Sequence, residues 1–385
     1  MKLSALQNWK EAIQSPITLK EYTRKLNNYA KFFEITNWDT YLTKGSDDIH
    51  SDLELFISEQ KKKGIKNITI KGYLNSIFLM MDMNRVVVFK KIHLNKLKKD
   101  GKMVGGGTPY TADEIFRMVK STPTLRIKAL ILFLSSTGIR PAGLTDPPLR
   151  IKHLQEIENC YCVTIYSESD QSYFVFLTPE SRNALDQYLE SRKLNGEKLT
   201  DESPLFANVI DRYGSIGEPI TNDSISAIMN RVIKKAGIQK NKNGNRFDKA
   251  LSYGMRKYFN GKMKLNKDVN SNVAEKMIGH SKTHKLDSVY FAPTIQECFA
   301  EFKKIIPELT IDPTNRQKIQ IEKLIGEKTE LEKEKQHTTE LEQRLREFEN
   351  TQMKMMELIQ SGRATLENFK DNEIRMKLSA TTISN

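Results

Sequence analysis

The chain has 385 residues, 28% of them charged and 38% hydrophobic, with 61 Lys and Arg against 48 Asp and Glu. This length predicts two or three folded units, and the net charge of +13 favours a polyanionic partner, nucleic acid ahead of an acidic membrane surface. The sequence has neither an apolar signal-peptide segment nor a run of roughly 20 apolar residues that could span a membrane, so we expect a soluble cytoplasmic protein. Because it also lacks a CxxC pair, we expect its three cysteines to be buried thiols.

The N-terminal hundred residues predict a small basic bundle of helices. Within 15–34, apolar and aromatic residues recur every three or four positions, which is typical of an amphipathic helix. Similar spacing recurs at 51–64, where Gly64 ends the pattern, and at 69–84. Residues 1–107 hold 19 Lys and Arg against 11 Asp and Glu, a net +8, so most of the excess positive charge lies here.

The following segments set the domain boundaries. We assign residues 1–98 to the helical domain and the charged, glycine-rich residues 99–108 to a linker. Residues 109–312 form a second domain, 316–360 a coiled coil and 361–385 a flexible tail. The predicted fold class is mainly α with a small β-sheet, an α+β fold.

The second domain combines helical patterns with one β-hairpin. Thr111 and Glu114 have the spacing of a capping box, and 125–138 is apolar enough to predict a buried helix. Residues 162–180 alternate apolar and polar residues around a polar tip at 167–172, which predicts a hairpin. Pro179 then begins a helix, and further helices are predicted at 222–237 and 248–263.

The region 316–360 carries an interrupted heptad repeat. Its a positions include Leu324, Leu331, Thr338, Leu345 and Ile359, its d positions include Leu341, Phe348 and Met355, and Glu327, Glu334 and Gln352 interrupt the seam. With 9 basic and 10 acidic residues between 314 and 360, its charge nearly cancels. We therefore favour a coiled coil that contacts protein over a lone solvated helix.

Four residues are candidates for a catalytic site: Arg140, Arg256, His280 and Tyr290. Each of them also has an alternative role to be weighed. Arg140 could pair with a carboxylate, Arg256 could be structural, and Tyr290 is one of 13 tyrosines, most of which pack as core rings. His280 and His284 have the spacing of two metal ligands on one helix. A zinc protease, however, needs a glutamate directly after the first histidine, and Ser281 stands there, so we predict no metal site.

The order of these pieces resembles the catalytic domain of tyrosine recombinases, the phage integrase family. Arg140 follows Thr-Gly, a hairpin comes next, Arg256 lies in a helix, and Gly279-His280 precedes Tyr290 by ten residues. The basic helical domain is similar to the core-binding domain of that family. The segment 178–193, with Thr-Pro-Glu, a helix and Tyr-Leu-x-x-Arg-Lys, looks most like archaeal viral and proviral integrases.

The resemblance implies that Tyr290 attacks a DNA phosphodiester and forms a 3′-phosphotyrosyl link, while Arg140, Arg256 and His280 bind the phosphate. Tyr253 occupies the first position of the family's HxxR motif. Bond energy is retained, so no cofactor is expected, and the expected partner is double-stranded DNA, with self-association into a tetramer on it. The coiled coil would supply contacts between subunits.

Besides tyrosine in place of histidine at position 253, two departures from the family pattern leave alternatives open. The hairpin tip 167–172 lacks the family's lysine, which protonates the leaving 5′-oxygen. The lysine-rich stretch 240–249 is a speculative alternative source of that proton. In addition, Gly143 stands where the family has an acidic residue. An inactive recombinase-fold protein that binds DNA and recruits partners through the coiled coil is therefore the main alternative. A type IB topoisomerase would use the same chemistry, but the small N-terminal domain and the C-terminal helix favour recombination.

Overall fold

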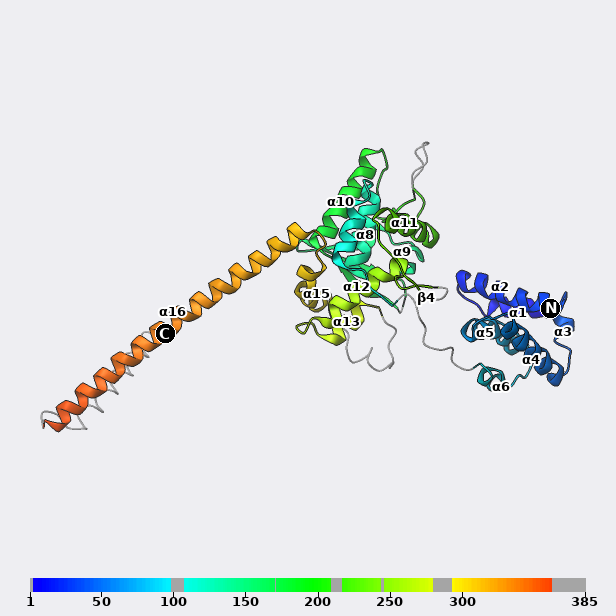
Figure 1. Ribbon diagram of the computed structural model, residues 1–385, viewed down its shortest axis with the longest axis horizontal. Helices are drawn as coiled ribbons and strands as arrows, with labels where there is room; N and C mark the ends of the chain where they lie inside the picture. Colours follow the sequence, from blue (N-terminus) through cyan, green and yellow to red (C-terminus); the bar gives the residue numbers. More distant parts are fainter. Residues whose placement is uncertain are drawn as a thin grey trace. The chain divides into compact units, whose positions relative to one another are not determined.

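The computed structural model describes residues 3–97, 107–169, 171–208, 217–243, 246–279 and 293–361 (Figure 1). The chain divides into two compact units, Met1–Val104 and Gly105–Asn385. The predictions for His280, His284 and Tyr290, and nearly all of those for the tail, lie outside the described residues. No described helix is both long and apolar enough to cross a membrane.

The first unit is helical in its described part. Its helices are α1 (Ala5–Glu11), α2 (Pro16–Phe32), α3 (Trp38–Tyr41), α4 (Ser46–Lys62), α5 (Asn67–Met83) and α6 (Lys90–Asn95). The Ser15 side chain caps α2 by accepting from the amide of Thr18, and Gly64, at φ 70°, follows α4. The core is formed mainly by buried aromatic and aliphatic residues that include Trp9, Leu26, Tyr29, Leu53 and Phe56. The helices predicted at 15–34, 51–64 and 69–84 are therefore confirmed.

A histidine pair fastens α6 to α4. His50 Nδ1 and His93 Nε2 share a hydrogen bond of 2.7 Å, and the Phe89 amide donates to His50 Nε2 at 3.3 Å. His50 must then carry its proton on Nδ1 and donate it to His93. His93 is fully buried, and its Nδ1 has no partner in the described part of the chain. Burial lowers the pKa of His93 most, because it disfavours the charged ring. His50 lowers this pKa further, because a second proton on His93 would face the N–H of His50.

This pair predicts that the first unit loses stability on acidification. A histidine whose folded-state pKa lies below its unfolded value contributes its full stability above the unfolded pKa of about 6.5, and that stability falls as the pH drops toward the folded value. Trp9 and Trp38 are the only tryptophans of the chain, so denaturant unfolding followed by tryptophan fluorescence reports on this unit. We expect the denaturant concentration at the unfolding midpoint to decrease as the pH is lowered from 7 to 5. His93→Phe should weaken this dependence on pH. If the midpoint of the variant depends on pH as strongly as that of the natural chain, His93 is not the source of the dependence.

The second unit is mainly helical with a small sheet, which confirms the predicted fold class. Its helices are α7 (Ala112–Lys120), α8 (Leu125–Thr137), α9 (Ala142–Thr145), α10 (Pro179–Leu194), α11 (Asn222–Lys235), α12 (Leu251–Leu265), α13 (Ser271–Met277), α15 (Ile295–Leu309) and α16 (Pro313–Gln360), with a 3-10 turn η1 (Ile151–His153). The capping box of Thr111 and Glu114 is present at α7, and Thr178 caps α10 with Pro179 at its first position. Both features agree with the sequence patterns.

The predicted hairpin lies inside a three-stranded antiparallel sheet. Its strands are β1 (Leu154–Ile157), β2 (Cys160–Ile165) and β3 (Tyr173–Leu177), in the order β1-β2-β3. Ile165 pairs with Tyr173 at the end of the hairpin, next to the polar tip. The first strand was not predicted, and neither was the short pair β4 (Lys242–Asn243) and β5 (Arg246–Phe247).

Helix α8 is the centre of this unit. Every residue from Ala129 to Thr137 is buried, because α10, α12, α7 and β3 all pack against the helix; Figure 1 shows α8 and α10 side by side. Cys160, Cys162 and Cys298 are buried and free, as predicted. The C-terminal end of α8 is thereby held rigidly, which matters for the arginine that follows it.

Helix α16 covers the region of the predicted coiled coil. It runs unbroken for 48 residues, and its start is tied to the unit because Glu180 accepts hydrogen bonds from the amides of Ile311 and Asp312. Beyond that start its side chains are largely exposed. The helix is therefore observed, whereas its pairing in a coiled coil stays a prediction.

Candidate active site

Two arginines from distant elements meet at the C-terminal end of α13. Arg140 follows α8 and donates from Nη1 to the carbonyl of Gly279 at 2.8 Å. Arg256, on α12, donates from Nη2 to the carbonyl of Ile278 at 2.7 Å and from Nη1 to that of Gly138 at 2.8 Å. The two guanidinium groups are thus held by consecutive carbonyls, immediately before the position of His280.

A glycine at the end of α8 brings these elements close together. Gly138 adopts φ 59° as the helix C-cap, a left-handed conformation that glycine adopts at low cost. A Cβ at this position would lie 2.5 Å from Cδ1 of Phe259 on α12. Because glycine permits both the turn and this contact, its carbonyl reaches Arg256 on the same helix as Phe259.

A second glycine fixes the turn that receives both arginines. Gly279 has φ 62°, and a Cβ there would lie 2.4 Å from Cζ of Tyr173, the first residue of β3. The Tyr173 ring therefore packs directly on the backbone of the turn. The resemblance implies an acidic residue at position 143, where this chain has glycine. Arg140 instead donates to the carbonyl of Gly279, which orients its guanidinium.

Substituting this glycine should be costly. Gly279→Ala should destabilise the second unit by about 1–2 kcal/mol for the left-handed backbone and by a further 1–3 kcal/mol or so for the overlap with Tyr173. Gly237→Ala is the matched control, since Gly237 has φ 65° and nothing within 4 Å of its Cβ position. Calorimetry on the full chain should show the larger loss for Gly279→Ala, and equal losses would contradict the role of the Tyr173 contact.

The arginine pair carries positive charge that no carboxylate of the described residues neutralises. Neither Arg140 nor Arg256 forms an ion pair with any carboxylate in the described part of the chain. Arg256 is 6% exposed, and burial, followed by the proximity of Arg140, lowers its pKa. A guanidinium still keeps its proton in proteins. Two neighbouring cations that donate only part of their hydrogens to carbonyls suit an anion such as a phosphate diester.

Tyrosines surround the arginines. Tyr173 carries a buried hydroxyl with no hydrogen-bond partner among the described residues, and burial raises its pKa to about 12 against the opposing effect of Arg256. Tyr166, at the end of β2, adopts φ 54°, a conformation that costs a non-glycine residue energy and recurs at functional sites. Burial raises the pKa of Tyr166, while Arg140 opposes the shift. Sequence reasoning missed both residues, although they flank the tip of the predicted hairpin.

The predicted site residues are thus brought together in part. Arg140 and Arg256 converge, and Tyr253 lies on α12 one turn before Arg256 with half of its surface exposed. His280 and Tyr290 lie outside the described residues, so their positions stay predictions.

The lysine-rich stretch 240–249 has other contacts in its described part. Lys249 forms an ion pair with Glu114 at the start of α7, and both side chains are largely buried. Lys240 lies over the ring of Phe247, 4.8 Å from its centroid. Neither contact involves the two arginines, so the speculative role of this stretch as a proton source gains no support.

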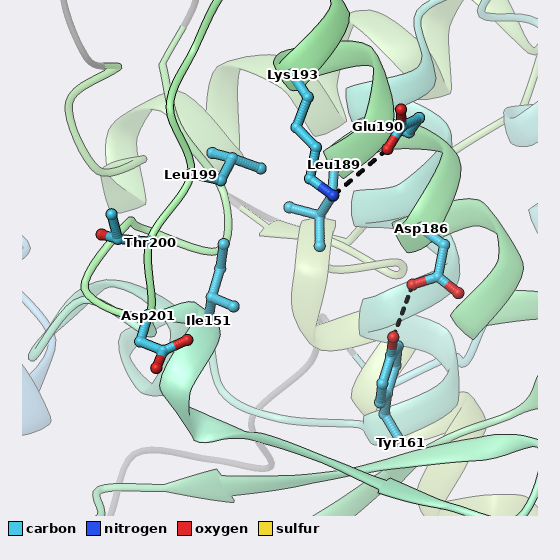
Figure 2. A pocket seen from close by; sticks show the side chains of 9 residues that line it. All are labelled: Ile151, Tyr161, Asp186, Leu189, Glu190, Lys193, Leu199, Thr200 and Asp201. Carbon is cyan, nitrogen blue, oxygen red and sulfur yellow. Dashed lines mark hydrogen bonds and ion pairs between the residues drawn. The ribbon is translucent and has the colours of Figure 1, made fainter.

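A cavity of about 410 Å³ lies elsewhere in the second unit (Figure 2). It borders α10, β2 and the segment 199–201, and none of its lining residues belongs to the arginine cluster. Four of its polar side chains pair with one another: Tyr161 donates to Asp186 at 2.9 Å, and Lys193 lies 3.5 Å from Glu190. The arginine cluster, rather than this cavity, is the candidate active site.

Comparisons with known proteins show what the second unit is similar to. Residues 109–297, just under half of the chain, match the model of the Phage integrase family, while no curated protein matches the sequence. Similar solved structures include the XerA recombinase, at 19% identity over 78% of this chain and 97% of that one, with a TM-score of 0.36. The Tn1549 transposon integrase in complex with circular intermediate DNA has 16% identity over 78% and 99%, with a TM-score of 0.50.

A variant of the Tn1549 integrase, also with circular intermediate DNA, has 15% identity over 79% of this chain and 100% of that one, with a TM-score of 0.51. At these identities the Tn1549 structures establish a shared fold and nothing further. The matched region contains both arginines, the three-stranded sheet and the turn at Gly279. Residues 109–297 are thus similar in sequence to the Phage integrase family, and the Tn1549 structures have a similar fold.

Proposed function

We propose that the chain is a site-specific DNA recombinase, an integrase that cuts and rejoins duplex DNA through a 3′-phosphotyrosyl intermediate. The observation that carries this proposal is the pair Arg140 and Arg256, held side by side on the carbonyls of Gly279 and Ile278 with no carboxylate partner among the described residues. The family match at 109–297 and the circular intermediate DNA bound in the Tn1549 integrase structures support it.

In the proposed reaction, the Tyr290 hydroxyl attacks the scissile phosphorus and loses its proton. The bond to the 5′-oxygen breaks, and that oxygen takes up a proton and leaves as a 5′-hydroxyl. A 5′-hydroxyl from a partner strand then attacks the phosphotyrosyl link and restores the diester. The arginine forks stabilise the extra negative charge on the nonbridging oxygens, and His280 donates to the same phosphate. Tyr253, at the first position of the family motif, is assigned a hydrogen bond rather than a proton-abstracting role. The chemistry requires neither metal nor nucleotide.

The remaining parts of the chain are assigned by their charge and pattern. Residues 1–98, which carry most of the excess positive charge, are proposed to bind the DNA backbone as a core-binding domain, joined to 109–312 by the linker 99–108. Recombination between two duplexes needs several protomers, so we propose a tetramer on DNA with contacts through a coiled coil at 316–360. The resemblance of 178–193 to archaeal viral and proviral integrases is the sole basis for a proposed origin of that kind.

The second candidate is an inactive DNA-binding protein with the same fold. The observation that favours it is the hairpin tip, which has no lysine to protonate the leaving oxygen. Its phosphate site would then hold DNA without cleaving it. The persistence of both arginines in one cluster argues for the active enzyme.

Trapping of the intermediate separates these candidates. DNA sites selected by binding to the full chain are nicked so that cleavage releases a short strand and the reaction stops at the covalent stage. We expect an adduct that survives denaturing electrophoresis and forms equally in the presence of EDTA. Tight binding without an adduct would favour the inactive DNA-binding protein, and an adduct that EDTA abolishes would contradict metal independence.

A further inference from the structure

Helix α16 exposes a row of large apolar side chains. Leu324, Leu331, Leu341, Leu345 and Phe348 are between 51% and 64% exposed. Soluble monomers rarely expose a long apolar row of this kind without a partner. Its position in a helix of about 70 Å points to another helix as the covering element.

The heptad assignment gives the layers that such a pair would form. The a positions are Leu324, Leu331, Thr338, Leu345 and Gln352, and the d positions are Glu327, Glu334, Leu341, Phe348 and Met355. In a parallel pair each layer brings a residue against its own copy. Glu327 would face Glu327 and Glu334 would face Glu334, so two layers would each hold two like charges at a desolvated seam.

An antiparallel pair removes these repulsions, because each a position then faces a d position. Alignment about the midpoint between Thr339 and Glu340 produces three layers without charge, Leu324 with Met355, Leu331 with Phe348, and Thr338 with Leu341. The same alignment sets Glu327 against Gln352 and Glu334 against Leu345. No layer then contains two carboxylates.

The flanking charges favour the same orientation. At the e positions, antiparallel alignment brings Lys328 to Glu349 and Lys335 to Glu342, and the two-fold symmetry repeats both pairs. Lys328 also lies 3.7 Å from Glu332 of its own helix, an exposed contact of little energy. A parallel pair would also form attractive contacts, Glu330 with Lys335 and Arg344 with Glu349. It would, however, place Lys323 beside Lys328 across the seam, a repulsion that the antiparallel pair avoids.

We infer that α16 pairs antiparallel with the α16 of a second copy of this chain, centred between Thr339 and Glu340. The paired helices then overlap over about 30 residues or more, and their starts at Pro313 lie about 80 Å apart. If the chain is the recombinase proposed above, this pairing links protomers whose catalytic units are widely separated, rather than neighbours on one DNA site.

The orientation can be measured with spin labels on the full chain. Single cysteines introduced as Glu322→Cys and Glu340→Cys lie outside the a, d, e and g positions, and the three natural cysteines are buried. For an antiparallel pair, electron–electron double resonance should give about 50 Å between labels at 322 and less than about 20 Å between labels at 340.

Each other outcome overturns the inference. Short distances at both positions would establish a parallel pair, and the absence of any distance between chains would exclude pairing of α16. Reversal of Lys328 and Lys335 to glutamate should abolish the pairing, and further reversal of Glu342 and Glu349 to lysine should restore it. These distances do not depend on DNA cleavage, so they test the pairing separately from the proposed function.

Discussion

Replacement of Arg256 by lysine is expected to lower the rate of covalent adduct formation by about 10²–10³-fold, with little change in overall DNA affinity. The guanidinium spans two carbonyls, those of Gly138 and Ile278. An ammonium group keeps the charge but presents no planar fork, so it cannot hold both carbonyls and a phosphate oxygen at once. Affinity should persist because most of it comes from backbone contacts along the DNA.

Arg192→Lys is the matched control for this substitution. Arg192 is also buried, and it donates to Glu197 at 2.7 and 2.6 Å and to the carbonyl of Pro204 at 2.7 Å, with no contact to Arg140 or Arg256. The Arg192→Lys substitution should lower the stability of the second unit without changing the rate of adduct formation per folded molecule. Single-turnover rates corrected for the folded fraction provide the comparison. Similar losses for both variants, or an unchanged rate in Arg256→Lys, would contradict the role of Arg256.

The elements that the sequence predicted well are those with a strong periodic pattern. The apolar run 125–138 became the buried helix α8, and the alternation around 167–172 became the hairpin of β2 and β3. These patterns report burial on one or all faces, which is what the local sequence encodes. Strand β1 was missed because its four residues, with only the two ends partly buried, carry almost no such signal.

The candidate active site was predictable only in part. Resemblance brought Arg140 and Arg256 together, but their actual contacts are backbone carbonyls at Gly138, Ile278 and Gly279, which leave no trace in side-chain patterns. The packing of Tyr173 on Gly279 joins residues far apart in the chain and depends on tertiary structure. The partner proposed for α16 is a second molecule, so the sequence of one chain indicates the chemistry of the contact but not its geometry.

Replacement of Tyr290 by phenylalanine is expected to abolish the adduct, the largest effect that the proposed mechanism allows. The substitution removes only the attacking oxygen, so the arginine pair should still bind the phosphate, and DNA affinity should be retained. Tyr253→Phe is the control, because Tyr253 is the half-exposed tyrosine one turn from Arg256. It should slow the reaction through a lost hydrogen bond and still produce an adduct.

The most direct measurement is the identification of the tyrosine that becomes linked to DNA. The adduct formed by the natural chain on a nicked site is digested with protease and nuclease, and the nucleotide-bearing peptide is sequenced by mass spectrometry. The proposal predicts that the modification lies on Tyr290 and that Tyr290→Phe yields none. A modified Tyr253, or an adduct that persists in Tyr290→Phe, would contradict it.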